Sequence, residues 1–242
     1  MYQVMQSVIR AIYPPQCVAC DAMTVAEHGL CGECWAQTAF ISGAICDNCG
    51  VPLPGEDYGD VLTCDDCMTI ARPWDHGRAA LVYRGLGRRL VLGLKHGDRQ
   101  DLAWPAAGWM AERLEGFDLS HAVIVPVPLH WSRLLKRKYN QAGLLAQGIG
   151  KRLGRPVCVD ALQRVRATAS LDGQGRRARF ATLSDAIAPH ARRAHMLAGR
   201  DVVLVDDVMT TGATLAACTE AARLAGAANV YCVTLARVQK DT

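Results

Sequence analysis

The feature that most constrains the fold of this chain is the stretch VVLVDDVMTTGATL at residues 202–215. Its first four residues are apolar and mostly β-branched, which predicts a buried strand of a parallel sheet. Two adjacent carboxylates, Asp206 and Asp207, follow at the carboxyl end of that strand, and an alanine-rich helix is expected from Leu215 to Leu224. Open α/β sheets bind ligands at such a position, between the end of a strand and the start of a helix. The stretch therefore predicts an α/β fold with a ligand site at this junction.

The loop between strand and helix has the composition of a phosphate-binding cup. Five consecutive residues supply backbone N–H groups and three hydroxyls: Thr210, Thr211, Gly212, Ala213 and Thr214. The helix dipole favours a negative charge here, and the glycine lets the backbone approach it closely. Asp206 and Asp207 repel a phosphate, so we expect them to bind sugar hydroxyls, or Mg²⁺ through water. The loop thus suits a ribose 5-phosphate; the alternative is that these residues only end a strand and cap a helix.

Charge is divided unevenly along the 242 residues, whose formal net charge is +4. Residues 1–74 hold 2 basic and 9 acidic side chains, whereas residues 75–242 hold 25 basic and 14 acidic ones. This asymmetry indicates two units, of which the basic one is expected to bind a nucleotide-like ligand, a nucleic acid, or both. No apolar run reaches the roughly 18 residues of a membrane span, and the first residues lack the layout of a signal peptide. A cytoplasmic protein without a membrane span is expected.

Cysteine spacing predicts two zinc sites in the acidic unit. Eight of the eleven cysteines form four C-x-x-C pairs, at Cys17/Cys20, Cys31/Cys34, Cys46/Cys49 and Cys64/Cys67. One pair presents two thiolates to a metal and two pairs complete a tetrahedron, so two structural Cys₄ zinc sites are expected. Sequential pairing groups the first four cysteines and the last four, while interleaved pairing and iron–sulfur ligation stay open as alternatives. Such a short, acidic ribbon is expected to need its metals for folding and to bind nucleic acid poorly.

Two basic segments are candidates for binding phosphate groups or DNA. A strand expected at residues 122–127 is followed by four basic residues: Arg133, Lys136, Arg137 and Lys138. Because they follow a strand end in a phosphate-seeking unit, we expect phosphate contacts, although a solvated helix face would show the same pattern. Residues 162–187 have the composition of a mobile segment and include Arg176 and Arg179. This segment is expected to form a lid over the ligand, with a plain surface loop as the alternative.

The stretch at residues 202–215 resembles the motif by which type I phosphoribosyltransferases bind 5-phosphoribosyl 1-pyrophosphate (PRPP). The shared pattern is an apolar strand, two acids, two spacers and a TTGAT loop. The resemblance implies that Asp206 and Asp207 bind the ribose 2- and 3-hydroxyls, that residues 210–214 hold the 5-phosphate, and that Mg²⁺ accompanies PRPP. It also implies a pyrophosphate-binding loop at residues 125–129, whose charge the basic residues after it would neutralise. Thr210 stands where some purine-salvage members carry a third acid, so a base-activating acid is missing here.

Three motifs combined with the tandem cysteine pairs resemble the ComF-type competence family. The motifs are LKHGDR at residues 94–99, RKYNQAGLLA at 137–146 and VLVDDVMTTGATL at 203–215. Proteins of this family join a double zinc ribbon to a phosphoribosyltransferase-like domain. The resemblance implies a role in DNA uptake during natural transformation, with a helicase-like partner and incoming single-stranded DNA. The family's middle T-x-x-Q motif is not matched, because Ala169-Ser170-Leu171 follows Thr168.

The predicted architecture has two parts. An N-terminal helix and a double zinc ribbon are expected at residues 1–72, followed at residues 73–242 by a phosphoribosyltransferase-like parallel sheet flanked by helices. The predicted function is PRPP binding in a ComF-type protein of DNA uptake. One alternative is an active phosphoribosyltransferase of nucleotide metabolism with an unidentified acceptor. The other is a non-catalytic adaptor for single-stranded DNA, for which Trp131 and Tyr139 are the near aromatic residues able to stack on bases.

Overall fold

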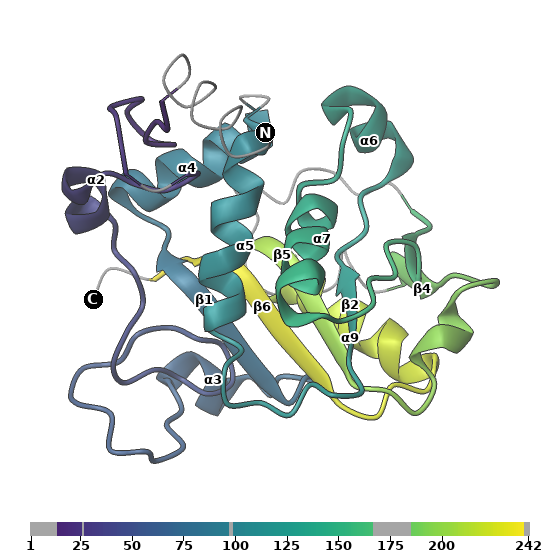
Figure 1. Ribbon diagram of the computed structural model, residues 1–242. Coiled ribbons are helices and arrows are strands. Elements are labelled where there is room, and N and C mark those ends of the chain that lie inside the picture. The colour runs from purple at the N-terminus through teal and green to yellow at the C-terminus, as the bar shows by residue number, and fades with distance from the viewer. Residues whose placement is uncertain (1–13, 26, 97–98, 167–184, 240–242) are drawn as a thin grey trace.

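The computed structural model describes residues 14–25, 27–96, 99–166 and 185–239, and a parallel sheet lies at the centre of this part of the chain (Figure 1). The strand order is β1-β6-β5-β2, and every neighbouring pair runs parallel. Their bounds are β1 His76–Val82, β6 Val230–Arg237, β5 Val202–Met209 and β2 Val123–Pro126. Parallel neighbours place all carboxyl ends at one edge, so the segments after β1, β2 and β5 begin at the same side of the sheet.

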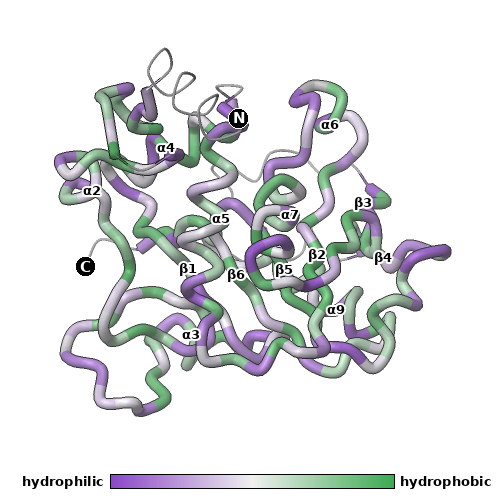
Figure 2. Tube along the Cα trace, in the orientation of Figure 1, coloured by the Kyte–Doolittle hydropathy of each residue, from purple (hydrophilic) through white to green (hydrophobic). Residues whose placement is uncertain are grey.

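Both faces of the sheet are covered, which explains why its strands read as continuous apolar runs. Alternate residues point to opposite faces: Val203 and Val205 join one buried cluster, and Val202 and Leu204 join the other. The hydropathy colouring in Figure 2 follows this pattern, with hydrophobic strands at the centre and hydrophilic segments around them. The core sits in these two layers on either side of the sheet.

Helices form the outer layers. In Figure 1, one face is covered by α4 Gly85–His96, α5 Ala103–Glu112 and α7 Gln141–Leu153, with the short 3₁₀ turn η1 Gln100–Leu102 between the first two. The other face is covered by α9 Ala213–Leu224, the hairpin of β3 Leu162–Arg164 and β4 Ile187–Pro189, and η2 Ala194–Leu197. A further helix, α6 Trp131–Arg137, projects beyond the layer formed by α7. None of the helices in the described residues is long and apolar enough to cross a membrane.

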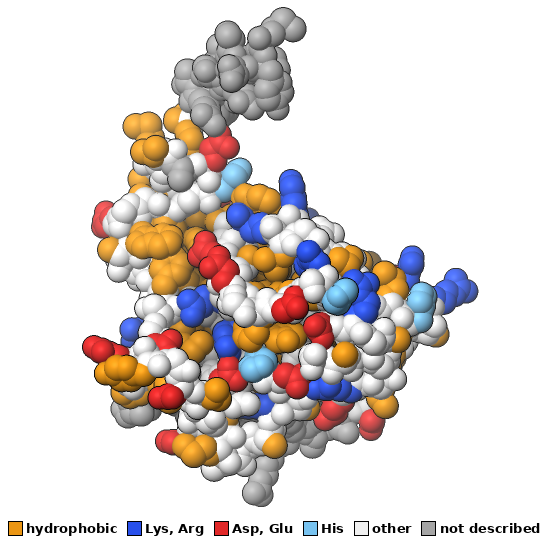
Figure 3. Space-filling model, turned by 60° about the horizontal axis from the view of Figure 1, so that its bottom comes forward, with side chains coloured by type: hydrophobic (Ala, Val, Ile, Leu, Met, Phe, Trp, Pro, Cys, Tyr) orange, Lys and Arg blue, Asp and Glu red, His pale blue; other side chains and the backbone are white. Residues whose placement is uncertain are grey.

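The cysteine-rich segment folds against the outer edge of the sheet and carries two short helices, α2 Gly32–Gln37 and α3 Asp65–Thr69. Its second half packs so tightly on β1 that a Cβ on Gly77 would lie 2.4 Å from the Asn48 carbonyl oxygen. Gly50 has a φ of +68°, and its Cβ would lie 2.8 Å from the Ala79 nitrogen. The face shown in Figure 3 mixes basic, acidic and hydrophobic side chains, without a continuous field of one sign.

Most of the elements expected from the sequence are present in the described residues. The strand expected at 122–127 is β2, and the helix expected from Leu215 begins two residues earlier, at Ala213. The expected lid segment begins and ends in the paired strands β3 and β4. The expected N-terminal helix and residues 167–184 of the expected lid lie outside the described residues.

Candidate functional site

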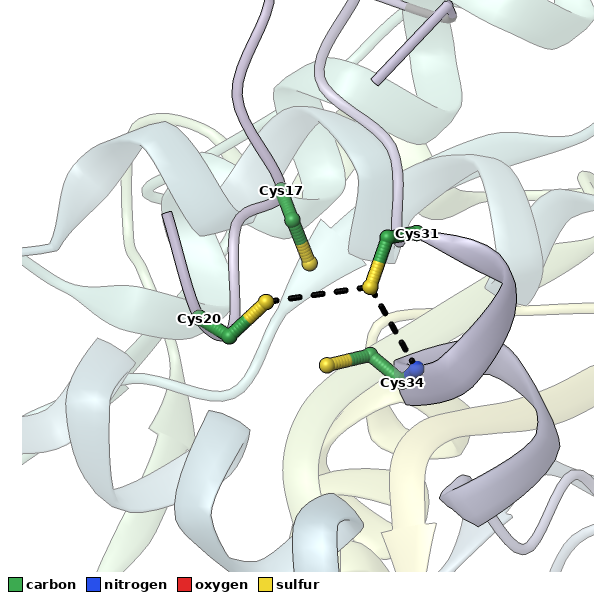
Figure 4. Close-up of side chains that lie close together, drawn as sticks. All are labelled: Cys17, Cys20, Cys31 and Cys34. Carbon is green, nitrogen blue, oxygen red and sulfur yellow. Dashed lines mark hydrogen bonds between the residues drawn. The ribbon is translucent and has the colours of Figure 1, made fainter. Parts of the chain in front are cut away.

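Two groups of four cysteines have the geometry of closed zinc sites. In each group the four sulfur atoms lie within 4.8 Å of one another, and the groups are Cys17/Cys20/Cys31/Cys34 and Cys46/Cys49/Cys64/Cys67. In the first group the side chains point toward a common centre (Figure 4), and the Sγ atoms of Cys20 and Cys31 are 3.7 Å apart. A tetrahedral site with Zn–S bonds of about 2.3 Å requires sulfur atoms about 3.8 Å apart. The thiols therefore fit zinc, and the sequential grouping is the one that the fold brings together.

The two cysteine groups differ in what surrounds their sulfur atoms. In the first, backbone N–H groups of Ala19 and Cys34 donate to sulfur, each at 3.5 Å. In the second, Nε of Arg72 donates to Sγ of Cys67 at 3.4 Å, and Nη2 of Arg237 donates to Sγ of Cys49 at 3.7 Å. A hydrogen bond from Cys46 and the charge of Arg237 lower the pKa of Cys49 to about 4, although burial opposes this shift. This favours the thiolate at Cys49, which is the form that binds a metal. In the same group, the hydrogen bond to Cys49 raises the pKa of Cys46, and burial raises the pKa of Cys67.

The acid pair stands at the carboxyl end of β5 and faces a lysine from another element. Asp207 is buried, and its Oδ1 lies 3.1 Å from Nζ of Lys95 at the end of α4. The pKa of Lys95 is raised because the charges of Asp207 and Asp206 outweigh the opposing effect of burial. Desolvation and the neighbouring Asp207 charge raise the pKa of Asp206 to about 7. Two adjacent carboxylates are therefore held in a poorly solvated place, and one positive charge partly compensates them.

The loop after β5 forms a small hollow at the start of α9. Gly212 has a φ of +83°, a left-handed conformation that favours glycine, and Oγ1 of Thr211 accepts a hydrogen bond from the Ala213 amide at 3.4 Å. The hollow is lined by Asp206, Val208, Met209, Thr210, Thr211, Gly212, Ala213, Thr214 and Leu215. It thus joins one of the two acids to all five residues that the sequence assigns to phosphate binding.

The motif RKYNQ holds Lys95 in place from the start of α7. The Tyr139 hydroxyl donates to the Leu94 carbonyl at 2.9 Å, and Nε2 of Gln141 donates to the Lys95 carbonyl at 3.4 Å. Asn140 caps α7 through the Ala142 amide at 3.1 Å, and its Nδ2 donates to the carbonyl of Val127 in the loop after β2 at 3.0 Å. Three motifs that are far apart in the sequence therefore meet at the carboxyl edge of the sheet.

The basic residues that the sequence assigns to phosphate or DNA contacts lie at different distances from the acid pair, and some are not described. Arg133 is half-buried on α6, and its charge, together with desolvation, lowers the pKa of Arg164 on β3, whereas the Asp206 charge acts in the opposite direction. Arg137 donates to Oε1 of Gln141 at 3.2 Å, and Lys138 is an exposed, left-handed residue that ends α6. The structure thus links Arg164 electrostatically to Asp206, and Arg133 to Arg164. The side chain of Lys136 and the residues Arg176 and Arg179 lie outside the described part of the chain.

Sequence reasoning missed the residue that contacts the acid pair most directly. Lys95 lies within the motif LKHGDR, but the motif alone assigned it no role. No spacing within that motif indicates that Lys95 reaches Asp207, because the contact depends on how α4 packs against the sheet. Arg164 carries no signal in the sequence either, because its strand is only three residues long.

These features define a class of protein in which a double zinc ribbon is joined to a phosphoribosyltransferase-like fold. Residues 8–68 match the family model "Double zinc ribbon domain", and residues 141–242 match "Phosphoribosyl transferase domain". The DNA utilization protein YhgH of Salmonella typhimurium is 31% identical over 231 residues, which cover 93% of this chain and 97% of that protein. The chain belongs to the ComF-type family, as the motifs predicted.

The same family includes relatives named for competence. Competence protein F of Haemophilus influenzae is 28% identical over 243 residues, which cover 92% of this chain and 96% of that protein. Competence protein ComFC of Bacillus subtilis is 26% identical over 196 residues, which cover 78% of this chain and 75% of that protein. The similarity therefore extends over both the cysteine-rich segment and the sheet.

Proposed function

We propose that the chain binds Mg²⁺–PRPP at the carboxyl end of β5 and acts in the uptake or use of DNA. The first half of the proposal rests on the site, and the second on the names of the relatives in the same family. In this proposal Asp206 and Asp207 bind the ribose hydroxyls, and residues 210–214 hold the 5-phosphate by their backbone N–H groups and hydroxyls. In this proposal the protein handles a phosphoribosyl ligand, incoming single-stranded DNA and a helicase-like partner.

The observation that supports PRPP binding most strongly is the meeting of the acid pair, Lys95 and the Gly212 loop at one edge. A sugar diol needs acceptors, a 5-phosphate needs a nest of N–H groups, and a pyrophosphate needs cations, and each of these groups is present at this edge. Capping of α9 alone would require neither two adjacent acids, of which Asp207 is buried, nor the lysine against Asp207. The arrangement therefore fits a phosphorylated sugar better than it fits a plain strand end.

If the site also transfers the phosphoribosyl group, catalysis would be mainly electrostatic. Mg²⁺ supplies charge to the leaving pyrophosphate when it is bound with PRPP. Lys95, Arg133 and Arg164 would add positive charge at the same edge while C1′ takes on oxocarbenium character. A release of pyrophosphate that requires both acids would identify an active phosphoribosyltransferase, and its acceptor would then be sought among nucleobases and related amines.

The direct test is a calorimetric titration of the zinc-loaded chain with Mg²⁺–PRPP. Wild type is compared with the double variant Asp206→Asn/Asp207→Asn and with Asp185→Asn, which removes an exposed carboxylate elsewhere. We expect binding by wild type and by Asp185→Asn, and at least a hundredfold loss in the double variant, with zinc content unchanged. No heat from wild type at millimolar ligand, under conditions where the chain is folded, would contradict the proposal.

A second candidate function is binding of single-stranded DNA, and it is favoured by the surface around α6. Trp131 is 66% exposed there, and Arg133, Arg137 and Lys138 belong to the same turn of chain. Next to it lies an open hollow of about 610 Å³, to which Trp131 and Tyr139 both contribute. Arg164 also lines this hollow, and the basic residues of α6 lie beside it. Aromatic rings with cations close by are the combination that binds unpaired bases and their phosphates.

Two measurements test this second function: the salt dependence of DNA binding and the effect of replacing Trp131. Binding of an oligothymidylate, followed by anisotropy, should weaken steeply between 50 and 200 mM salt, because phosphate contacts release counterions. Trp131→Ala should weaken binding about tenfold, since stacking on one base contributes roughly 1–3 kcal/mol. Trp104→Ala is the control, because Trp104 is also partly exposed but lies on α5 beneath Arg152. Equal effects of the two variants would contradict a DNA site at α6.

A further inference from the structure

Two arginines join the second cysteine group directly to the loop after β5. Arg72 donates through Nε to Sγ of Cys67 at 3.4 Å and through Nη1 to the Thr211 carbonyl at 2.6 Å. Arg237 donates through Nη2 to Sγ of Cys49 at 3.7 Å and through Nη1 to the Thr210 carbonyl at 2.8 Å. Each guanidinium therefore has one donor on a metal ligand and another on the backbone of the candidate phosphate loop.

Charge favours this arrangement at the second group in particular. Four thiolates around one Zn²⁺ carry a net charge of −2, and two guanidinium groups compensate it. Arg237 is 3% exposed, so its hydrogen bonds form in a poorly solvated interior where charge-assisted bonds are strong. At the first group the hydrogen bonds found in the described residues come from backbone N–H groups and a thiol, not from a cation. The first group therefore has no comparable connection to the loop.

Packing at the same junction leaves the loop little freedom. A Cβ on Gly212 would lie 2.8 Å from Cη2 of Trp74 and 2.9 Å from Nη1 of Arg72. Nε1 of Trp74 donates in turn to the carbonyl of Asn48, the residue before Cys49, at 2.5 Å. One continuous set of contacts thus runs from the Cys46/Cys49 pair through Trp74 and the two arginines to Gly212.

We propose that Arg72 and Arg237 are positioning residues through which the second zinc site holds the loop at residues 210–214 in its ligand-binding shape. That the loop's ligand is PRPP rests on the function proposed above, whereas the dependence of the loop on the second site does not. Side chains that hydrogen-bond to metal ligands commonly orient those ligands. In this proposal the guanidinium groups of Arg72 and Arg237 also orient the loop at residues 210–214. Thermodynamic reciprocity then requires that a ligand on the loop strengthens zinc binding at the second site.

Hydrogen exchange of the amides of residues 210–214, measured without any ligand, tests whether the two arginines hold the loop in place. The zinc-loaded full chain is compared with Arg72→Gln, Arg237→Gln and Arg72→Lys. The amides of residues 230–233, at the end of β6 away from Arg237, report global stability. Arg99→Gln is the matched control, because Arg99 donates to the Val18 carbonyl beside the first group, at 3.1 Å. We expect about tenfold faster exchange at residues 210–214 in both Gln variants, with two zinc ions retained and β6 unchanged. Arg72→Lys should recover part of the protection, and the control should behave as wild type.

Removal of one metal ligand tests the zinc side of the proposal. Cys64→Ser removes a partly exposed ligand of the second group and leaves both arginines in the chain, and Cys20→Ser is its counterpart in the first group. Faster loop exchange in Cys64→Ser alone supports the proposal. Equal changes in the two serine variants, or normal loop exchange in zinc-loaded Gln variants, would overturn it. A Gln variant that loses zinc supports the proposal only if the loop exchanges faster while β6 keeps its protection, and otherwise counts against it.

A parallel titration with Mg²⁺–PRPP separates this inference from the proposed function. If wild type binds, the Gln variants should bind about tenfold more weakly. If wild type does not bind while the exchange results are as expected, the PRPP function fails and the connection between zinc site and loop stands. If wild type binds PRPP but the loop exchanges normally in the Gln variants, the PRPP function stands and the connection between the zinc site and the loop fails.

Discussion

Nζ of Lys95, at the end of α4, lies 3.1 Å from Oδ1 of Asp207, at the end of β5. The two residues come from distant parts of the chain, and the end of α4 lies against the carboxyl end of β5. Both side chains are mostly buried, so neither charge is well solvated without the other. Each of the two side chains therefore supplies the counter-charge that the other needs.

Removal of the lysine should destabilise the chain more than removal of both partners. We expect Lys95→Met to lower the free energy of unfolding by about 2 kcal/mol, because a buried carboxylate is left without its partner. The double variant Lys95→Met/Asp207→Asn should recover at least half of this loss. Urea titrations of the four members of the cycle measure the coupling.

The control for this cycle is Lys151→Met, which removes an exposed lysine that lies 5.1 Å from the Trp104 ring centroid. Its effect should stay below about 0.5 kcal/mol, as for most surface substitutions. Additive losses in the cycle would show that Lys95 and Asp207 do not interact in solution.

The acid pair should make stability depend on pH in a direction opposite to that of most carboxylates. The pKa of Asp206 is about 7 in the folded chain, above the usual value of about 3.9 in an unfolded one. Between pH 4 and pH 7 the folded chain therefore binds more protons than the unfolded chain, and its free energy of unfolding falls as the pH rises. Asp206→Asn should remove this contribution, and a slope identical to wild type would contradict the shifted pKa.

The same ionisation should govern ligand binding. A protonated Asp206 cannot accept hydrogen bonds from a diol through both oxygens, so PRPP affinity should fall by up to tenfold per pH unit below pH 7. Calorimetry at pH 6 and 8, in buffers of different ionisation enthalpy, should show proton release on binding at pH 6 and little at pH 8. Affinity that does not change between these pH values would exclude Asp206 as an ionised ligand group.

Gly212 should tolerate no side chain, for two separable reasons. Gly212→Ala places a Cβ at a positive φ and 2.8 Å from Trp74, so we expect a loss of about 1–3 kcal/mol in unfolding free energy and loss of phosphate binding. Gly116→Ala is the matched control, because Gly116 has a φ of +91° and nothing within 4 Å of its Cβ position. The difference between the two variants measures the contacts with Trp74 and Arg72 together, and equal melting temperatures would mean that the loop can move away.

Tyr139→Phe separates the structural role of this residue from a role in base stacking. The variant loses the hydrogen bond to the Leu94 carbonyl but keeps the ring, so it should unfold about 1 kcal/mol more easily and bind PRPP more weakly as Lys95 shifts. Its affinity for an oligothymidylate should not change, because stacking needs only the aromatic face. A loss of DNA binding without a change in stability would reverse this assignment.

The sequence predicted the local parts of the molecule well. The apolar run before Asp206 is a strand with both faces buried, which is what an uninterrupted β-branched pattern requires. The C-x-x-C pairs form two four-sulfur groups, because a knuckle of two nearby cysteines is a local structure that spacing alone specifies. Assignment to the ComF-type family is confirmed as well, whereas the roles of the acids and of the loop stay predictions.

What the sequence determined by itself was therefore a set of features that depend on neighbours along the chain: the strand before Asp206, the cysteine pairs, and the helix after the loop to within two residues of its start. Only the tertiary structure decided which distant groups meet. It set Lys95 against Asp207, and it set Arg72 and Arg237 between the cysteines and the loop. No spacing rule encodes such pairs, because they depend on how separate segments pack against one another, and a charge in a packed interior needs partners from whichever segments surround it.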